Sequence, residues 1–189
     1  MSDTLFPILP AQIRHKLFFA AIPPPDVAEA LAEVWREQGT GARLRADRLH
    51  LTVYYAAALP QASDAVTAAL RSAGDSLRAA PFTLTFDRLT AFGGRADNRA
   101  LVALAPDGLG AAQALSDALR DGCIRAGVRP PKGGHATIRP HVTLAYGHGF
   151  DADRPIAAPV SWTIDRVVLI DSLQGQGRHV HLAEWVLAR

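Results

Sequence analysis

Two short stretches of the sequence, at residues 50–52 and 141–143, carry a histidine followed two residues later by a threonine. Each stretch opens a run of β-branched and aromatic residues, which predicts a strand. Side chains alternate along a strand, so each histidine should share a face with the threonine of its own motif, while the residue between them packs on the other face. The sequence therefore predicts an imidazole beside a hydroxyl on two strands that lie far apart in the chain.

Such a pair of motifs suits acid–base catalysis if the two strands face each other across a cleft. An unperturbed histidine has a pKa of about 6.5, so at neutral pH one ring can be neutral and the other protonated. His50 and His141 would then be a base and an acid, and the hydroxyls of Thr52 and Thr143 would bind the oxygens of an anion between them. Displacement at phosphorus fits this arrangement, because one ring takes the proton from the attacking hydroxyl while the other protonates the leaving oxygen. The chemistry requires neither a metal nor another cofactor.

The same order of elements precedes each motif: an apolar strand, an amphipathic helix and a polar loop. Alternation and helical periodicity place the elements of the first half at residues 16–23, 23–39 and 49–57, and those of the second half at 99–106, 108–127 and 141–147. Asp26 is placed to cap the first helix and Gly39 to end it. The recurrence predicts two related halves, each with one His-x-Thr strand.

The remaining segments complete an α+β fold. A second helix is expected at residues 63–77, a strand at 81–92, and two strands joined by a glycine-rich turn within 161–188. Strands and helices are mixed without strict alternation, which favours mainly antiparallel sheets. We therefore expect a bilobal molecule of two pseudo-symmetric halves, with helices flanking the sheets around a central cleft. Residues 1–14 would be an N-terminal extension and residues 15–189 a single domain.

Composition and charge narrow the class of partner. The 189 residues are 49% hydrophobic, as expected of a globular protein, and the formal charge of +2 is mildly basic. This charge permits contact with an anionic ligand but falls short of the dense basic surface of a nucleic-acid coat protein. The single cysteine, Cys123, rules out an internal disulfide and is expected to be a packing residue. Without a signal peptide or a membrane-spanning run, the sequence predicts a cytoplasmic protein with no membrane contact and no obligate protein partner.

Basic residues near the motifs are candidates for binding phosphate. Arg139 lies two residues before the second histidine and should extend from the same face, so we expect it to be a third phosphate contact. Arg43, Arg45 and Arg48 lie in the loop before the first motif. They would either line the mouth of the cleft or stay in solvent, and the sequence leaves both interpretations open.

The other histidines lack partners of the kind that a metal site needs. His179 and His181 alternate in the last strand, but no cysteine or carboxylate lies at ligand spacing, so a surface or packing role is expected instead. His135 and His148 lie in loops near the second motif, without a matching partner. The sequence therefore predicts no metal site.

Longer stretches around these motifs resemble a known family. The segments KLFFAAIPPPDVAEAL, LHLTVYYAA, PFTLTFDRLTAF, RPHVTLA and VVLIDSLQGQGRHVHLAEW are similar to those of the two-histidine (2H) phosphoesterase superfamily. They look most like its bacterial branch, the RNA 2',3'-cyclic phosphodiesterases that are also called 2'-5' RNA ligases. The likeness runs from about residue 15 to the C-terminus.

This resemblance implies a bilobal fold without a metal cofactor, in which a terminal 2',3'-cyclic phosphate of RNA is opened to a 2'-phosphate. Carried onto this sequence, it makes His50 the proton donor to the leaving 3'-oxygen and His141 the proton acceptor that activates water. Thr52 and Thr143 would hold the non-bridging oxygens. The reverse reaction would join a 5'-hydroxyl to the cyclic phosphate, with the acid and base roles exchanged.

The sequence departs from the family pattern after each motif. Relatives commonly carry a basic residue there, whereas this chain has Tyr54 after the first motif and Tyr146 after the second. We expect these tyrosines to contact substrate by stacking on a base. The missing cations leave two alternatives open: a phosphodiesterase of small cyclic nucleotides or 2'-5' oligonucleotides, or a non-catalytic module that binds RNA ends.

Overall fold

The computed structural model describes residues 12–38, 43–44, 46–93, 99–129, 131, 137–147, 150 and 153–188. Within them, eight strands form one sheet in the order β6-β3-β4-β5-β2-β1-β7-β8, and neighbouring strands are antiparallel. The strands are β1 (His15–Ala21), β2 (Leu51–Leu59), β3 (Phe82–Phe92), β4 (Arg99–Leu104), β5 (His141–Gly147), β6 (Asp153–Ile164), β7 (Arg166–Leu173) and β8 (Arg178–Val186). The helices are α1 (Pro25–Arg36), α2 (Asp64–Asp75) and α3 (Leu109–Arg125), with a 3-10 helix, η1 (Ala46–Arg48), before the first motif. This arrangement confirms the predicted α+β class.

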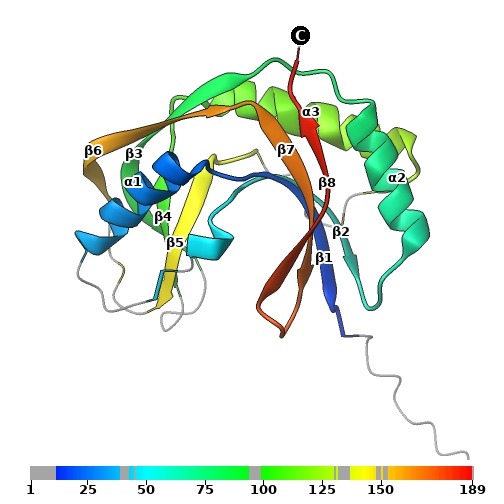
Figure 1. Cartoon of the computed structure of the whole chain (residues 1–189), viewed down its shortest axis with the longest axis horizontal. Coiled ribbons are helices and arrows are strands. Elements are labelled where there is room, and N and C mark those ends of the chain that lie inside the picture. The colour runs from blue at the N-terminus through cyan, green and yellow to red at the C-terminus, as the bar shows by residue number, and fades with distance from the viewer. Residues whose placement is uncertain are drawn as a thin grey trace, which may run out of the picture.

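The sheet is an arch made of two four-stranded halves (Figure 1). β1, β2, β7 and β8 form one half, and β3, β4, β5 and β6 form the other. The halves meet where β2 and β5 lie side by side, through the antiparallel pair of Leu51 and Val142. Both of these side chains are completely buried. The two motif strands are therefore the centre of the sheet.

One helix that follows a strand of each half packs against the other half. α1 lies between β1 and β2 in the chain, yet it packs against β5 and β6 of the other half. In the same way, α3 lies between β4 and β5 and packs against β2 and α2. The buried stripe of α1 contains Val27, Leu31 and Val34, and that of α3 contains Leu115 and Leu119, as their helical spacing predicts. Among the helices in the described ranges, none has the length and apolar character needed to cross a bilayer.

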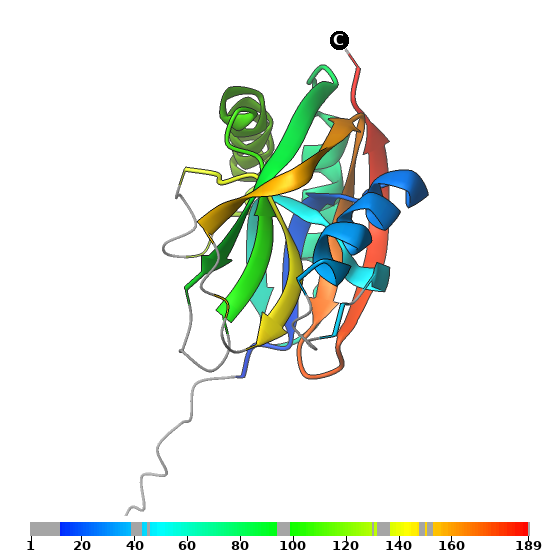
Figure 2. The same ribbon diagram turned by 90° about the vertical axis from the view of Figure 1, so that its left-hand side faces the viewer.

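The edge strand β6 is an element that periodicity did not predict. We expected two strands within 161–188, whereas the structure has a further one, because β6 begins at Asp153. Pro155 and Pro159 hide it in the sequence, since proline cannot donate to a β-ladder. Among the described strands β6 pairs with β3 alone, at the margin of the sheet, where a missing donor is tolerated. Figure 2 shows it running across the front of the green strands.

The helix termini follow the prediction in part. Ser63 caps α2, because its hydroxyl accepts a hydrogen bond from the backbone N–H of Val66 at 3.3 Å. α1 instead begins after Pro24, with Asp26 in its first turn and no side-chain cap. The prediction that Asp26 caps this helix is therefore wrong, although its carboxylate still lies at the positive end of the helix dipole. Gly39, the predicted stop, lies outside the described residues.

Both motif strands contain a β-bulge directly after the threonine. The pairing of β2 with β1 passes over Val53, and the pairing of β5 with β4 passes over Leu144. An extra residue interrupts the alternation of a strand, so the side chains beyond it change faces. The bulges occupy equivalent positions in the two halves, which supports their relation by an approximate two-fold axis.

Candidate active site

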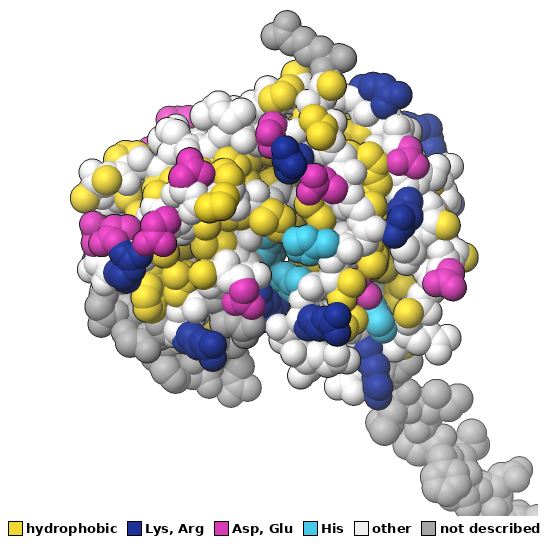
Figure 3. Space-filling view, in the orientation of Figure 1, with side chains coloured by type: hydrophobic (Ala, Val, Ile, Leu, Met, Phe, Trp, Pro, Cys, Tyr) yellow, Lys and Arg dark blue, Asp and Glu magenta, His cyan; other side chains and the backbone are white. Residues whose placement is uncertain are grey.

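The register at the centre of the sheet brings the two His-x-Thr motifs together. Leu51 pairs with Val142 in the antiparallel direction, so the histidine of each motif lies opposite the threonine of the other, on the face away from these two buried residues. The four motif side chains are partly exposed: His50, Thr52, His141 and Thr143. Figure 3 shows histidine side chains gathered near the centre of this side of the molecule, in the hollow between the two halves.

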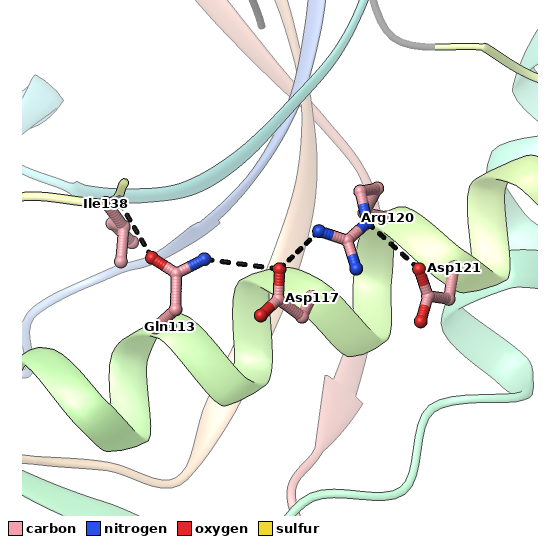
Figure 4. Close-up of polar contacts among 5 residues, drawn as sticks. All are labelled: Gln113, Asp117, Arg120, Asp121 and Ile138. Atoms are coloured by element: carbon pink, nitrogen blue, oxygen red, sulfur yellow. Dashed lines mark hydrogen bonds and ion pairs between the residues drawn. The ribbon is translucent and has the colours of Figure 1, made fainter. Parts of the chain in front are cut away.

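The segment that leads into the second motif is tied to α3 (Figure 4). The backbone N–H of Ile138 donates to Oε1 of Gln113 at 3.0 Å, and Nε2 of Gln113 donates to the carboxylate of Asp117 at 3.2 Å. Arg120 donates to the same carboxylate at 2.5 Å. α3 thus holds the backbone three residues before His141 in place.

Both catalytic candidates are oriented in the same way by their own backbone. Nδ1 of His50 lies 2.7 Å from the carbonyl oxygen of Arg48, and Nδ1 of His141 lies 2.6 Å from that of Arg139. A carbonyl oxygen only accepts hydrogen bonds, so each Nδ1 carries a proton and donates it. Nε2 is therefore the nitrogen of each ring that remains to accept or donate a proton in the cleft.

The surroundings of the rings lower the pKa of both histidines below its usual value. Burial is the main cause in each case, and the hydrogen bond to the backbone carbonyl opposes it. Neighbouring basic groups add to the lowering: His141, Arg48 and His181 lower the pKa of His50, and Arg139 lowers that of His141. Both rings accordingly favour the neutral form, and a phosphate bound beside a ring would raise its pKa.

A phenylalanine packs against each catalytic ring. The ring centroid of Phe18, in β1, lies 5.3 Å from that of His50, and the centroid of Phe92, at the end of β3, lies 4.7 Å from that of His141. The guanidinium of Arg139 lies over the Phe92 ring, 4.4 Å from its centroid. Arg139 is thus at the site and exposed, and its contact with phosphate stays a prediction.

A cavity of about 120 Å³ opens beside the first motif. It is lined by Arg43, Arg48, His50, Thr143, Leu144, Ala145, Tyr146 and His179. Two of the three loop arginines therefore line the site, which favours the first of their two interpretations. Arg45, His135 and His148 lie outside the described residues. A larger groove of about 360 Å³ between α1 and β6 contains no residue of either motif.

Comparison with known proteins places this site in a family. The family model of the 2'-5' RNA ligase superfamily matches residues 23–176, a stretch that includes both His-x-Thr motifs. The chain belongs to the 2'-5' RNA ligase superfamily. The match confirms the resemblance to 2H phosphoesterases that the sequence indicates. A search of curated proteins gave no match.

Several solved structures share this fold over more than nine-tenths of the chain. Apo LigT of E. coli is 26% identical, with a TM-score of 0.70, over 94% of this chain and 100% of that chain. LigT in complex with 3'-AMP gives 24% identity and a TM-score of 0.69 over the same shares, 94% and 100%. TT0787 of Thermus thermophilus gives 22% identity and a TM-score of 0.70 over 91% of this chain and 97% of that chain. The antiparallel sheet with its three helices thus matches the LigT fold.

His179 belongs to the site, although its sequence context favoured a surface or packing role. Its ring centroid lies 5.2 Å from that of His50, in an edge-on contact with an angle of 76° between the rings. Its Nε2 accepts a hydrogen bond of 2.9 Å from Nη2 of Arg48. Burial first, and then the charges of His50 and Arg48, lower the pKa of His179 to about 4. No local pattern indicates this role, because 131 residues separate Arg48 from His179 and only the fold brings them together.

The prediction that Tyr54 contacts substrate is wrong. Its side chain is 4% exposed and lies in the core near Cys123 of α3, where burial raises the pKa of its hydroxyl to about 12. The bulge at Val53 turns this side chain away from the face that carries the first motif. Tyr55 instead packs beside Phe18, on the side of the sheet where the catalytic rings lie.

Tyr146 occupies the position in the second half that matches Tyr55 in the first, beyond the bulge at Leu144. It is 64% exposed and lines the cavity beside His50. Its ring is thus available for stacking, and the contact with a base stays a prediction. The sequence does contain a signal for this pair of tyrosines, because both motifs extend to His-x-Thr-x-x-Tyr, which ends at Tyr55 and at Tyr146.

The part of the chain that the structure describes contains no group of three or more His, Cys, Asp or Glu side chains placed to hold a metal ion. Cys123 is buried in α3, and burial raises the pKa of its thiol to about 12. The thiol therefore stays protonated at neutral pH, in agreement with the packing role expected of it.

Proposed function

We propose that the protein is a metal-independent RNA 2',3'-cyclic phosphodiesterase, which opens a terminal 2',3'-cyclic phosphate to a 2'-phosphate. The observation that carries the proposal is the matched pair of imidazoles. Each Nδ1 donates to the carbonyl two residues before it, which leaves Nε2 of His50 and of His141 to the cleft. With a threonine hydroxyl opposite each ring, the site offers an acid, a base and two donors for an anion, which displacement at phosphorus needs.

In the proposed reaction, His141 is the proton acceptor and His50 is the proton donor. Nε2 of His141 takes a proton from water, and the water oxygen forms a bond to phosphorus while the bond from phosphorus to the 3'-oxygen breaks. Nε2–H of His50 gives its proton to the departing 3'-oxygen. The hydroxyls of Thr52 and Thr143 donate to the non-bridging oxygens, where negative charge grows. The rings end with exchanged protonation states, and proton exchange with solvent restores them.

The cavity supports this division of roles. The leaving 3'-oxygen stays attached to the nucleoside, so the ring that protonates it must lie beside space for a large group. The cavity of about 120 Å³ is lined by His50 and not by His141. The attacking water, on the side of His141, needs no such space.

The acid must hold a proton before it can act, although burial lowers the pKa of His50. In our proposal the cyclic phosphate provides the compensating charge, because an anion next to an imidazole favours its protonated form. The reactive pair of one neutral and one protonated ring would then form when the substrate binds. The base needs no such help, since the pKa of His141 is also lowered and its ring is neutral at neutral pH.

The direct test is to incubate the purified protein, with and without EDTA, with a short RNA that ends in a 2',3'-cyclic phosphate. The expected product is a 2'-phosphate, which chromatography separates from the 3'-phosphate. His50→Ala and His141→Ala should each lower turnover by about 100- to 10,000-fold. Full activity of either variant, or strong inhibition by EDTA, would contradict the proposal. An added RNA with a 5'-hydroxyl tests whether the protein also makes a 2'-5' linkage.

A small cyclic nucleotide or a 2'-5' oligonucleotide is the second candidate substrate. The exposed ring of Tyr146 in the cavity wall favours it, because stacking on a single base needs no further nucleotide. Faster turnover of a cyclic mononucleotide than of a cyclic-phosphate-ended RNA would support this candidate. The alternative of a non-catalytic RNA-end-binding module predicts RNA binding without turnover of either substrate, and binding that survives the loss of both His50 and His141.

A further inference from the structure

The cavity beside His50 carries positive charge from residues outside the two His-x-Thr motifs. Arg43 and Arg48 both line it, and none of its described lining residues is acidic. We propose that this cavity is a subsite for a second phosphate, the one that links the terminal nucleotide to the preceding nucleotide of the RNA. Arg48 binds this phosphate, and His179 is the positioning residue that holds Arg48. The inference rests on the proposed function, because it names a further substrate group at the same site.

His179 holds the guanidinium of Arg48 as a hydrogen-bond acceptor. Nη2 of Arg48 lies 2.9 Å from Nε2 of His179. A guanidinium only donates, so Nε2 is the unprotonated nitrogen and the ring is neutral when this contact forms. A pKa of about 4 keeps the His179 ring neutral at physiological pH. The pair therefore places one positive charge in the cavity wall. The orientation of the Arg48 guanidinium is fixed both by η1, which carries it, and by β8, which carries His179.

Arg48 keeps donors that this hydrogen bond does not use. A guanidinium carries five N–H groups in a planar fork that matches the oxygens of a phosphate. Nη2 contacts His179, whereas Nε is buried and has no hydrogen-bond partner among the described residues. Nε is therefore out of reach of a ligand, and the donors that can meet a phosphate are those of the terminal nitrogens, because Arg48 lines the cavity.

The position of the cavity identifies the second phosphate. His50 and Thr143 line the cavity and also belong to the two motifs, so a group in the cavity is a near neighbour of the cyclic phosphate. On the side of His50, that neighbour is the nucleoside that carries the 3'-oxygen. Its other phosphate is the 5'-phosphate, which a nucleotide within RNA has and a cyclic mononucleoside lacks. Tyr146, in the same wall, offers its ring to the base of this nucleotide.

The test compares kcat/KM for four substrates. They are adenosine 2',3'-cyclic phosphate, its 5'-phosphorylated form, a diadenosine dinucleotide that ends in the cyclic phosphate, and the same dinucleotide with an uncharged methylphosphonate linkage. The wild-type protein should prefer the two substrates with a charged 5'-phosphate by about 10- to 100-fold, the size expected of one charge-assisted contact. The methylphosphonate should lose this preference, because it keeps the second nucleoside and removes only the charge.

Variants separate the roles of the two side chains. Arg48→Gln should abolish the preference for the charged linkage. His179→Phe keeps an aromatic ring but offers Arg48 no acceptor, so it should reduce the preference, whereas His179→Gln keeps an acceptor oxygen and should retain most of it. Arg166→Gln is the matched control, since Arg166 pairs with Asp165 and Glu184 and does not line the cavity. The ratio of kcat/KM for two substrates, measured on the same variant, does not change if the variant merely folds less well, because the amount of folded protein affects both values equally.

Equal kcat/KM for the charged and the uncharged linkage in the wild type would overturn the proposal, as would a preference that survives Arg48→Gln. If the wild type turns over none of the four substrates, the proposed function fails, and binding of the same two dinucleotides to the wild type then tests the subsite alone. Tighter binding of the charged linkage that Arg48→Gln removes would support the subsite. Equal binding of both linkages would overturn it.

Discussion

Each catalytic ring lies between two opposing influences on its charge. Burial and neighbouring cations lower the pKa of His50 and His141, whereas the carbonyl that accepts from Nδ1 raises it. The net direction is downward for both rings, so the proposed base, His141, is neutral at neutral pH. The proposed acid gains its proton when an anion lies beside it. The protonation state of the pair is therefore a property of the rings and the bound phosphate together.

Replacing Arg139 with Gln should move the acid limb of the pH profile of kcat/KM to higher pH. His141 must be neutral to act as a base, so activity falls as the pH drops below the pKa of its ring. The Arg139 guanidinium lowers that pKa, and its removal lets the pKa rise, while the carbonyl that accepts from Nδ1 belongs to the backbone and is retained. The measurement is kcat/KM for a cyclic-phosphate-ended RNA across the acid range, with Arg166→Gln as the control. An unchanged limb in Arg139→Gln would show that this guanidinium does not act on His141.

The two tyrosines that follow the motifs should respond differently to substitution. Tyr146→Ala removes an exposed ring from the cavity wall and should raise KM by about 5- to 150-fold, the worth of stacking on one base. Tyr54→Phe removes a buried hydroxyl that has no hydrogen-bond partner among the described residues, so it should leave the kinetics unchanged and the free energy of unfolding equal or higher. Steady-state kinetics and urea unfolding measure both effects. A kinetic defect in Tyr54→Phe would show that the Tyr54 hydroxyl contributes to the site after all.

At the scale of elements, hydrophobic periodicity predicts most of the strands and helices that position the site. It fails where a bulge or a proline interrupts the alternation of a strand. The strands β1 to β5 and all three helices lie close to the expected ranges, and related halves imply that the two motif strands meet. The bulges at Val53 and Leu144 reverse the alternation beyond each motif, which is why Tyr54 lies in the core. Prolines hide β6, because only an edge position tolerates them. The contact of His179 with η1 joins two elements that are remote in sequence and leaves no local pattern.

Gln113 of α3 is expected to affect catalysis without touching the substrate. Its Oε1 accepts a hydrogen bond of 3.0 Å from the backbone N–H of Ile138, in the segment that leads to His141. Gln113→Met keeps the length of the side chain but leaves this N–H unpaired, so kcat should fall about 5-fold, the worth of about 1 kcal/mol. Asp117→Ala removes the carboxylate that accepts from Nε2 of Gln113 but leaves Oε1 of Gln113 to accept from Ile138, so it should retain activity. Equal losses in the two variants, or no loss in Gln113→Met, would show that this hydrogen bond does not aim the catalytic ring.

At the scale of the whole molecule, the two halves are joined by more than the contact of β2 with β5. α1 continues from β1 but packs on the half that contains β5 and β6, and α3 continues from β4 but packs against β2. Each half therefore buries part of its sheet under a helix that continues from the other half. The catalytic rings lie where the halves meet, so the acid and the base are paired only when both halves are folded. We therefore propose that residues 15–189 behave as one bilobal unit.

Unfolding of this unit should be a single transition that probes in both halves detect alike. Trp162 lies in β6 and Trp185 in β8, at opposite edges of the sheet, so each reports on one half. In two variants that each keep only one of these tryptophans, with Phe at the other positions, fluorescence and far-UV circular dichroism should give the same midpoint in urea. Leu31→Ala, which opens a cavity under α1, should lower the free energy of unfolding by about 2–5 kcal/mol in both variants. A shift seen by one tryptophan alone would mean that the halves unfold separately, because a helix shared between them must destabilise both when its packing is lost.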